Sequence, residues 1–263
     1  MDCKQIRKTL LQVSVLFLIT LIQLPAAATS ADDADAVHAP YSALLQKYVQ
    51  GNGVAYDAWD KNAADLQSLK DYLAEMAAQN PGDWEKDRAL AYWLNLYNAL
   101  TLNLILENYP VKSIKDLGSL LKSPWNKEIV TVAGKELTLN NIEHNIIRPR
   151  FDDPRIHFAL NCAAVSCPPL ASYAFLPSKL EAQLDAVCQN ALAQKNWLQL
   201  KDNTILVTKI MDWYGNDFRS GGGSIRTFLA KYQPEDKESI LDENNKLEFM
   251  DYDWALNRAK SSE

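Results

Sequence analysis

The feature that most constrains the fold is a long apolar stretch, residues 83–108, which predicts a helix without a polar face. A helix that is apolar all round is usually surrounded by other elements of its own protein. The charged start at 85–88 argues against a membrane span, so we expect the buried central helix of a soluble domain. Buried amides need hydrogen-bond partners. Asn95 and Asn98 are therefore expected either to hold neighbouring loops or to take part in a site.

The segments around this helix predict the fold class. Turn residues between short apolar runs predict hairpins at 129–138 and 197–207, and 247–254 adds a last strand. Seven further helices are expected, at 41–50, 65–78, 141–148, 177–192, 210–214, 225–232 and 234–241. We therefore predict one α+β domain over 41–257, mostly helical, with a small, mainly antiparallel sheet and a buried central helix. Residues 258–263 are read as a tail.

The N-terminus has the pattern of a secretory signal peptide. Basic residues precede an apolar run, and the alanines at 26–28 fit a cleavage site. We expect residues 1–28 to be removed on export to a bacterial periplasm or beyond, with no membrane association afterwards. Residues 29–40 are small, acidic and rich in alanine, and are predicted to form a disordered leader that includes His38.

The charge balance is acidic, with 27 lysines and arginines against 33 aspartates and glutamates and a net charge of −6. Loss of residues 1–28 removes three basic residues and one acidic residue, which leaves about −8. Such a chain is not expected to offer a surface for polyanions, so we predict no nucleic-acid partner. We predict no cofactor. A small molecule, a peptide or a glycan is the expected ligand, and the oligomeric state stays open.

One segment, 155–169, gathers the side chains best suited to chemistry. It holds His157, Cys162 and Cys167 within eleven residues. If this segment is a strand, alternation turns Cys162 toward the core and His157 toward the opposite, more polar face. Cys167 follows in a loop, before Pro168, and is expected to be the more accessible thiol.

Three cysteines remain after signal removal, so at least one thiol stays unpaired within the chain. Three states are open: a Cys162–Cys167 disulfide, a Cys167–Cys188 disulfide, and three reduced thiols. Cys188 falls on or next to the apolar face of the helix at 177–192. We expect it to be a packed structural thiol.

A thiol enzyme needs a thiolate, a base and a group that orients the base. His144 and His157 are the candidate bases. The candidate orienting groups are Glu143, Asn95 and Asn98. This set predicts a cysteine-dependent hydrolase or acyl transferase with Cys167 as the nucleophile.

The helix at 141–148 carries two of these residues. Asn140 is placed to cap it, and Glu143 follows three residues later, as in a capping box. Pairs four residues apart lie on one face of a helix, so His144 and Arg148 are expected to share an exposed or cleft-facing line.

Three alternatives compete with the hydrolase hypothesis. The first is a non-catalytic binding or interaction module, in which some of the seven tryptophans and eleven tyrosines line a groove and the cysteines are structural. The second is a thiol redox protein that uses Cys162 and Cys167, although four residues separate them instead of two. The third is a metal site built from His144, His157 and these two cysteines, whose spacing matches no common zinc pattern.

Four segments together resemble one protein family. They are YWLNLYNAL at 92–100, IEH at 142–144, the stretch from DPRIHFALNC to SCPP at 153–169, and YDWALN at 252–257. The chain resembles the domain-of-unknown-function 547 family over residues 85–257. The resemblance implies the stand-alone exported bacterial form of that family. It implies no activity, because the family is named for lacking an assigned function.

Overall fold

The structure of the protein is a computed structural model that describes residues 31–119 and 122–260. The signal peptide predicted for residues 1–28 lies outside the described residues. At the centre is helix α5 (Lys86–Leu106), which is long and apolar enough to cross a membrane. In this fold, however, 94% of its most apolar window is buried inside the protein. The predicted buried central helix is thus confirmed.

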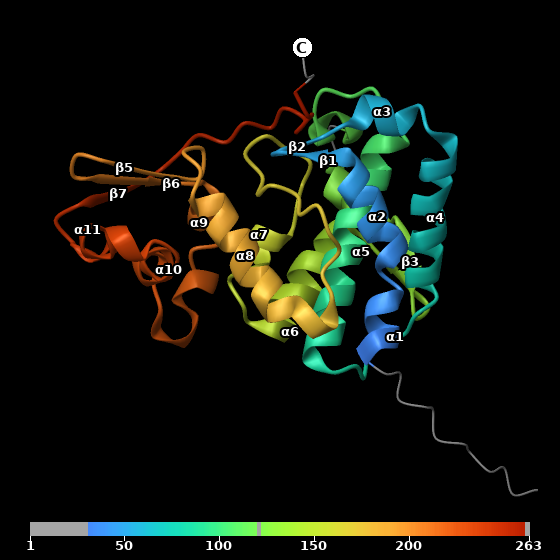
Figure 1. Cartoon of the computed structure of the whole chain (residues 1–263), viewed down its shortest axis with the longest axis horizontal. Helices are drawn as coiled ribbons and strands as arrows, with labels where there is room; N and C mark the ends of the chain where they lie inside the picture. The colour runs from blue at the N-terminus through green and yellow to red at the C-terminus, as the bar shows by residue number, and fades with distance from the viewer. Residues whose placement is uncertain (1–30, 120–121, 261–263) are drawn as a thin grey trace, which may run out of the picture.

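Four N-terminal helices pack together on one side of α5 (Figure 1). Tyr41 of α2 stacks on Tyr72 of α4, with ring centroids 4.8 Å apart, and this contact joins the two helices. The short β1–β2 hairpin leads from α2 to α3, where Trp59 stacks on Tyr48 at 4.5 Å. The elements of this part are α1 (Ala31–Ala36), α2 (Ala39–Tyr48), β1 (Val49–Gln50), β2 (Gly53–Val54), α3 (Tyr56–Asp60) and α4 (Ala63–Ala77).

The disordered leader predicted for residues 29–40 is wrong from residue 31 onward. Helix α1 and the start of α2 occupy this stretch. His38 is only 2% exposed, and its Nδ1 lies 2.9 Å from the hydroxyl of Tyr72. The alanine-rich composition permits a helix, and the buried histidine fixes the end of the leader to the domain.

The middle of the chain covers other faces of α5. The hairpin predicted at 129–138 is confirmed as β3 and β4. Ala133 and Gly134 at its tip have φ values of 48° and 76°, as a type I′ turn requires. The elements are η1 (Ile114–Leu117), η2 (Pro124–Asn126), β3 (Val130–Val132), β4 (Lys135–Leu137), η3 (Asn141–Ile147), α6 (Arg148–Phe151), α7 (Ile156–Ala159), η4 (Pro177–Lys179) and α8 (Leu180–Leu192).

The last third of the chain forms a three-stranded sheet beside helices α10 and α11, on the far side from α4 (Figure 1). Strands β5 and β6 form the hairpin predicted at 197–207, and β7 pairs with β6 in parallel. The elements are β5 (Leu198–Lys201), β6 (Thr204–Val207), α9 (Ile210–Trp213), η5 (Asp217–Gly222), α10 (Ile225–Tyr232), η6 (Pro234–Asp236), α11 (Lys237–Leu241) and β7 (Lys246–Phe249).

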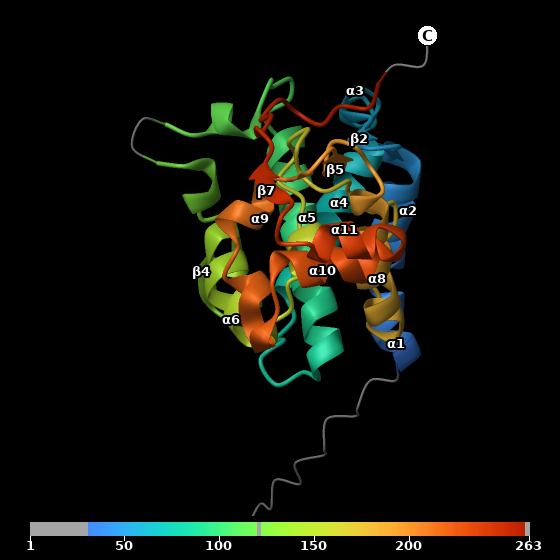
Figure 2. The ribbon, with the colours of Figure 1, turned by 90° about the vertical axis from the view of Figure 1, so that its left-hand side faces the viewer.

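After β7 the chain returns toward the N-terminal helices as an extended segment, drawn in red in Figures 1 and 2. Leu256 bridges to Ala164, and Arg258 bridges to Val54 beside the first hairpin. The predicted strand at 247–254 therefore ends early, at Phe249. The α+β class is confirmed, although the strands form three small sheets instead of one.

The segment predicted as a strand around His157 is wrong, because it begins with a helical turn, α7. The side chain of Asp153 accepts the N–H of Arg155, and its carbonyl accepts the N–H of Ile156. Pro154 is suited to the first turn of a helix because it has no N–H to satisfy. The Asp-Pro start therefore outweighs the alternating pattern that follows it.

Candidate active site

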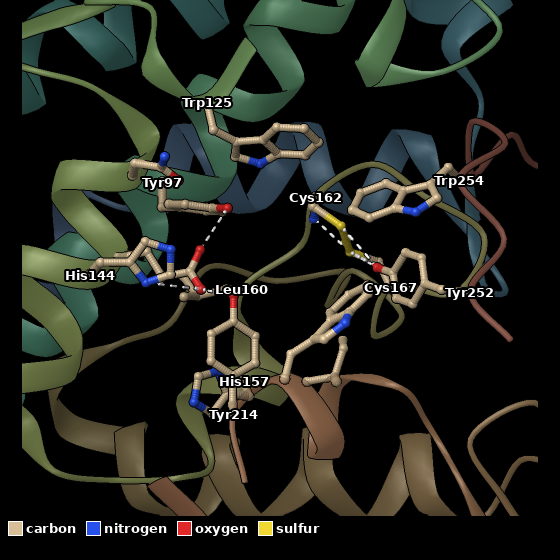
Figure 3. Close-up of a pocket in the computed structure, with 14 residues that line it drawn as sticks. Tyr97, Trp125, His144, His157, Leu160, Cys162, Cys167, Tyr214, Tyr252 and Trp254 are labelled. Carbon is tan, nitrogen blue, oxygen red and sulfur yellow. Dashed lines mark hydrogen bonds and ion pairs between the residues drawn. A yellow bond between two sulfur atoms is a disulfide. The ribbon is translucent and has the colours of Figure 1, made fainter. Parts of the chain in front are cut away.

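A cavity of about 270 Å³ opens where the central helix, the middle of the chain and the C-terminal segment meet (Figure 3). We call its two sides the carboxylate wall, made of Tyr97, Glu143, His144, His157 and Tyr214, and the sulfur wall, made of Cys162, Cys167, Trp213, Tyr252 and Trp254. The other lining residues are Trp125, Asn140, Leu160 and Ile210. Six of the fourteen lining residues are tyrosine or tryptophan, so the cavity is largely aromatic.

The carboxylate wall is centred on Glu143, which is 7% exposed. Its Oε1 accepts a hydrogen bond from the Tyr214 hydroxyl at 2.6 Å, and its Oε2 accepts one from the Tyr97 hydroxyl at 3.2 Å. Burial raises the pKa of both tyrosines well above the ordinary value. Both phenols therefore stay protonated at neutral pH and act as donors to the carboxylate.

Glu143 lies on η3, a π-helical turn in which the N–H of Arg148 donates to the carbonyl of Glu143 five residues earlier. Pro149 comes next and has no N–H, and its ring would collide with the carbonyl four residues before it in a regular α-helix. The wider turn avoids that collision. Single π turns are frequent at functional sites, where they change the direction of a side chain.

The capping box predicted for this helix is wrong. Asn140 has helical dihedrals and its side chain caps nothing. Instead, Thr138 and Asn141 exchange hydrogen bonds, from Asn141 N to Thr138 Oγ1 and from Thr138 N to Asn141 Oδ1. Glu143 is thereby free to turn toward the tyrosines.

His157 is held beside the carboxylate wall by an ionic network. It is 3% exposed, and its Nε2 lies 2.7 Å from Oδ2 of Asp217. Arg148 donates to both oxygens of the same carboxylate, at 2.7 and 2.8 Å. Burial alone would raise the pKa of Asp217, but the hydrogen bonds from Arg148 and His157 outweigh it and lower the pKa. The imidazole also stacks on Tyr214, with centroids 4.0 Å apart.

His144 is the more open of the two cavity histidines, with a side chain 36% exposed. Its Nδ1 lies 3.2 Å from Nη1 of Arg148, so the predicted line of these two residues is confirmed. The same nitrogen is 4.0 Å from Oε1 of Glu143, which is too far for a hydrogen bond. Glu143 therefore orients neither histidine, and Asp217 is the group that orients His157.

The sulfur wall contains a disulfide between Cys162 and Cys167. Cys162 is half-buried and Cys167 is 5% exposed, so the predicted order of accessibility is wrong. The strand alternation that placed Cys162 in the core does not apply after the helical turn α7. Cys188 is fully buried, as expected, and burial raises the pKa of its thiol.

Two donors face the disulfide. The backbone N–H of Cys162 donates to Sγ of Cys167 at 2.8 Å. The hydroxyl of Tyr252 lies 3.1 Å from Sγ of Cys162 and 3.3 Å from Sγ of Cys167 (Figure 3). Burial raises the pKa of Tyr252, so its hydroxyl stays protonated.

The returning C-terminal segment closes the sulfur wall with aromatic rings. Tyr252 lies between Trp254 and Trp213, at centroid distances of 4.5 and 4.7 Å. The N–H of Ser166 donates to the carbonyl of Asp253, and the N–H of Asp253 donates to the Ser166 hydroxyl. The loop that holds the disulfide and the segment that covers it are therefore bonded directly to each other.

Comparison with known proteins gives a match for part of the chain. Residues 81–191 match the family model described as "Protein of unknown function, DUF547". The chain contains a DUF547 domain. No curated protein and no solved structure matches the chain. The matched residues of the DUF547 domain include both cysteines of the disulfide, whereas Tyr214, Asp217 and Tyr252 come from the chain that follows it.

Asn95 and Asn98 of the DUF547 domain's central helix bind loop backbone outside the cavity. Asn95 donates to the carbonyl of Phe175 and accepts the N–H of the same residue. Asn98 donates to the carbonyl of Ala159 and accepts the N–H of Asn161. Both amides thus hold neighbouring loops, which was one of the two expectations, and Asn98 holds the start of the loop that contains the disulfide.

Sequence reasoning missed three residues of the site: Tyr214 and Tyr252, which line the cavity, and Asp217, which binds the lining residue His157. Tyr252 lies in a segment that carried the family resemblance, so its position was signalled but its role was not. Asp217 is 60 residues from His157 along the chain, and no local pattern connects the two. Within the described residues, no three His, Cys, Asp or Glu side chains gather as a metal site would require.

Proposed function

We propose that this protein performs thiol–disulfide exchange with a small ligand bound in the cavity, through Cys162 and Cys167. The observation that carries the proposal is the pair of donors facing the sulfurs, the Cys162 N–H and the Tyr252 hydroxyl. A buried disulfide with a purely structural role has no need of donors to a leaving sulfur. The position of both cysteines in the lining of this aromatic cavity supports the same reading.

In the forward reaction a ligand thiolate attacks Sγ of Cys162, the more exposed of the two residues. A bond forms between the ligand sulfur and Cys162, the Cys162–Cys167 bond breaks, and its electron pair leaves on Cys167. The Cys162 N–H and the Tyr252 hydroxyl stabilise that thiolate, which makes Cys167 the better leaving group. Hydrogen bonds to a charged group are worth about 1.5–3 kcal/mol each.

A second ligand thiolate then attacks the ligand sulfur of the mixed disulfide and displaces Cys162 as a thiolate. Two ligand thiols are oxidised to one ligand disulfide, and the protein disulfide is reduced to two thiols by the same two electrons. The reverse sequence reduces a ligand disulfide. The ligand enters as a thiolate that has lost its proton to solvent, since Nδ1 of His144 accepts a hydrogen bond from Arg148 and Nε2 of His157 is bonded to Asp217.

Thiol–disulfide exchange is favoured here over a cysteine-dependent hydrolase or acyl transferase. That chemistry needs Cys167 as a free thiolate next to a base, but Cys167 is oxidised and neither His144 nor His157 hydrogen-bonds to either sulfur among the described residues. The hydrolase and the non-catalytic binding module stay predictions. Export to a periplasm or beyond, which we also propose, would supply the oxidising compartment in which the disulfide persists.

The test is the rate at which dithiothreitol reduces the disulfide in the folded protein, followed by alkylation and mass spectrometry. The reference is a peptide of residues 160–169 with the same disulfide. We expect faster reduction in the protein and about a tenfold slower rate in Tyr252→Phe, which loses one hydrogen bond to the leaving sulfur. Tyr109→Phe removes a hydroxyl bonded to Asp57 outside the cavity and should leave the rate unchanged. Reduction no faster than in the peptide would contradict the proposal.

A further inference from the structure

We infer that the ligand of this cavity is a cationic thiol or disulfide whose ammonium group binds Glu143 while its sulfur reaches Cys162. This inference rests on the proposed exchange reaction and specifies its substrate class. It is carried by the charge and the hydrogen-bonding capacity of the carboxylate wall, together with the aromatic rings that face the same cavity.

Glu143 has unused capacity to accept hydrogen bonds. A carboxylate offers about four acceptor positions on its two oxygens. Tyr214 and Tyr97 each fill one of them with a neutral hydroxyl, one on each oxygen. The remaining positions require a donor, and the cavity is where a donor from outside the protein can approach.

The negative charge of Glu143 is not matched by a basic side chain of the protein. Within the described residues, no lysine or arginine lies at ion-pair distance from Glu143, and His144 approaches only to 4.0 Å. Arg148 interacts electrostatically with Glu143 from beyond that distance, and its guanidinium carbon lies 4.9 Å from the centroid of the Tyr214 ring. Arg148, however, binds both oxygens of Asp217, so its charge is already paired.

The aromatic lining favours the same kind of group. Cations bind over the faces of aromatic rings, with tryptophan the strongest of the three types. The protein already uses this attraction at the edge of the site, where Nζ of Lys115 lies 4.1 Å from the centroid of Trp254. Trp125 and Trp213 line the cavity without such a partner among the described residues, and Trp213 is 47% exposed.

The size of the cavity limits the ligand. A volume of about 270 Å³ is slightly below the usual range for small-molecule sites. An ammonium group, a short carbon chain and a sulfur fit this volume, whereas a folded protein partner could insert only one side chain. A small aminothiol, or its disulfide, therefore matches the charge, the lining and the reactive group.

The test uses two series of thiols with matched chain lengths of two to six carbons, one ending in an amine and one in a hydroxyl. The rate at which each reduces the disulfide is divided by its rate with the peptide of residues 160–169, which cancels the reactivity of the thiol itself. We expect the best amine to exceed its hydroxyl partner by about tenfold on the protein, and Glu143→Gln to remove this preference. Carboxylate-ended thiols should be slower than the hydroxyl series on the wild-type protein.

The possible outcomes distinguish failure of the cationic-ligand inference from failure of the proposed thiol–disulfide exchange. Fast reduction by amine and hydroxyl thiols alike would overturn the inference and leave thiol–disulfide exchange in place. Reduction of the protein no faster than the peptide by any thiol would overturn both. The comparison of amine with carboxylate thiols on the wild-type protein decides the matter even if Glu143→Gln does not fold.

Discussion

The two walls of the cavity are built in different ways. The carboxylate wall stands on helical backbone, with Tyr97 from the buried helix α5 and Glu143 from the π turn η3. The sulfur wall stands on a loop and an extended segment, in which Cys162 and Tyr252 are held by scattered backbone bonds and the isolated bridge from Ala164 to Leu256. A group that fixes a ligand benefits from rigid support, whereas a disulfide that opens and closes needs backbone that can adjust. Ligand binding and disulfide exchange therefore rest on different parts of the backbone: helices for binding, and a loop with an extended segment for exchange.

Asn98 connects the two walls. It projects from the same helix as Tyr97 and holds the backbone of Ala159 and Asn161, just before Cys162. Asn161 in turn donates from its side chain to the carbonyl of Pro168 and so fixes the other end of the disulfide loop. One buried amide therefore links the helix of the carboxylate wall directly to the loop of the sulfur wall.

The largest effect is expected from removing the sulfur pair. The double variant Cys162→Ser, Cys167→Ser should lose thiol–disulfide exchange completely and lose about 2 kcal/mol of unfolding free energy, because the disulfide closes only a short loop. Urea denaturation measures the second quantity. Cys188→Ala is the control, because Cys188 is buried away from the cavity lining, and its exchange rate should equal that of the wild type. Exchange that survives in the double variant would show that the sulfur wall is not where exchange takes place.

The next effect concerns the connection between the walls. Asn98→Ala and Asn95→Ala each remove two buried hydrogen bonds and leave a carbonyl and an N–H unpaired, so each should cost about 4 kcal/mol of unfolding free energy. Only Asn98 holds the disulfide loop. We expect slower or less selective exchange in Asn98→Ala, and a wild-type rate in the folded fraction of Asn95→Ala. Equal exchange in the two variants would show that Asn98 does not position the sulfur wall.

The smallest effect on exchange is expected at His38, which belongs to neither wall. Burial lowers the pKa of His38 from 6.5 to about 4, against an opposing contribution from Asp35. Because the folded pKa is depressed, the stabilisation is complete above pH 6.5 and is lost as the pH falls toward 4, by about 3 kcal/mol. Urea denaturation at several pH values should show this loss in the wild type and a flatter profile in His38→Gln. Parallel profiles would refute it, and the exchange rate at neutral pH should be the same in both proteins.

The fold was predictable where the residue pattern of a single segment determines its local structure. The all-apolar helix, the two hairpins and the buried position of Cys188 follow from spacing and turn residues alone. The helical turn at His157 was missed because a short alternating pattern was weighed above the Asp153-Pro154 start. The leader was misjudged because composition does not reveal that His38 meets Tyr72, 34 residues away in the chain.

The sequence predicted which residues line the site better than it predicted which partners those residues bind. His144, His157, Glu143 and both cysteines do line one cavity. The partners that give them roles come from distant parts of the chain: Asp217 binds His157, and Tyr252 faces the sulfurs. Such contacts depend on tertiary packing, so no spacing rule in a single sequence identifies them.

The most direct test of the account is the position of the first bond that forms with a ligand. The wild-type protein is mixed with a small aminothiol, quenched with acid and alkylated, and tandem mass spectrometry locates the mixed disulfide. The account predicts the adduct on Cys162 and the alkyl group on Cys167, because attack at Cys162, the more exposed residue, expels the sulfur of Cys167, which receives the N–H and hydroxyl bonds. An adduct on Cys167, or an intact disulfide with no adduct under conditions that open the peptide, would contradict it.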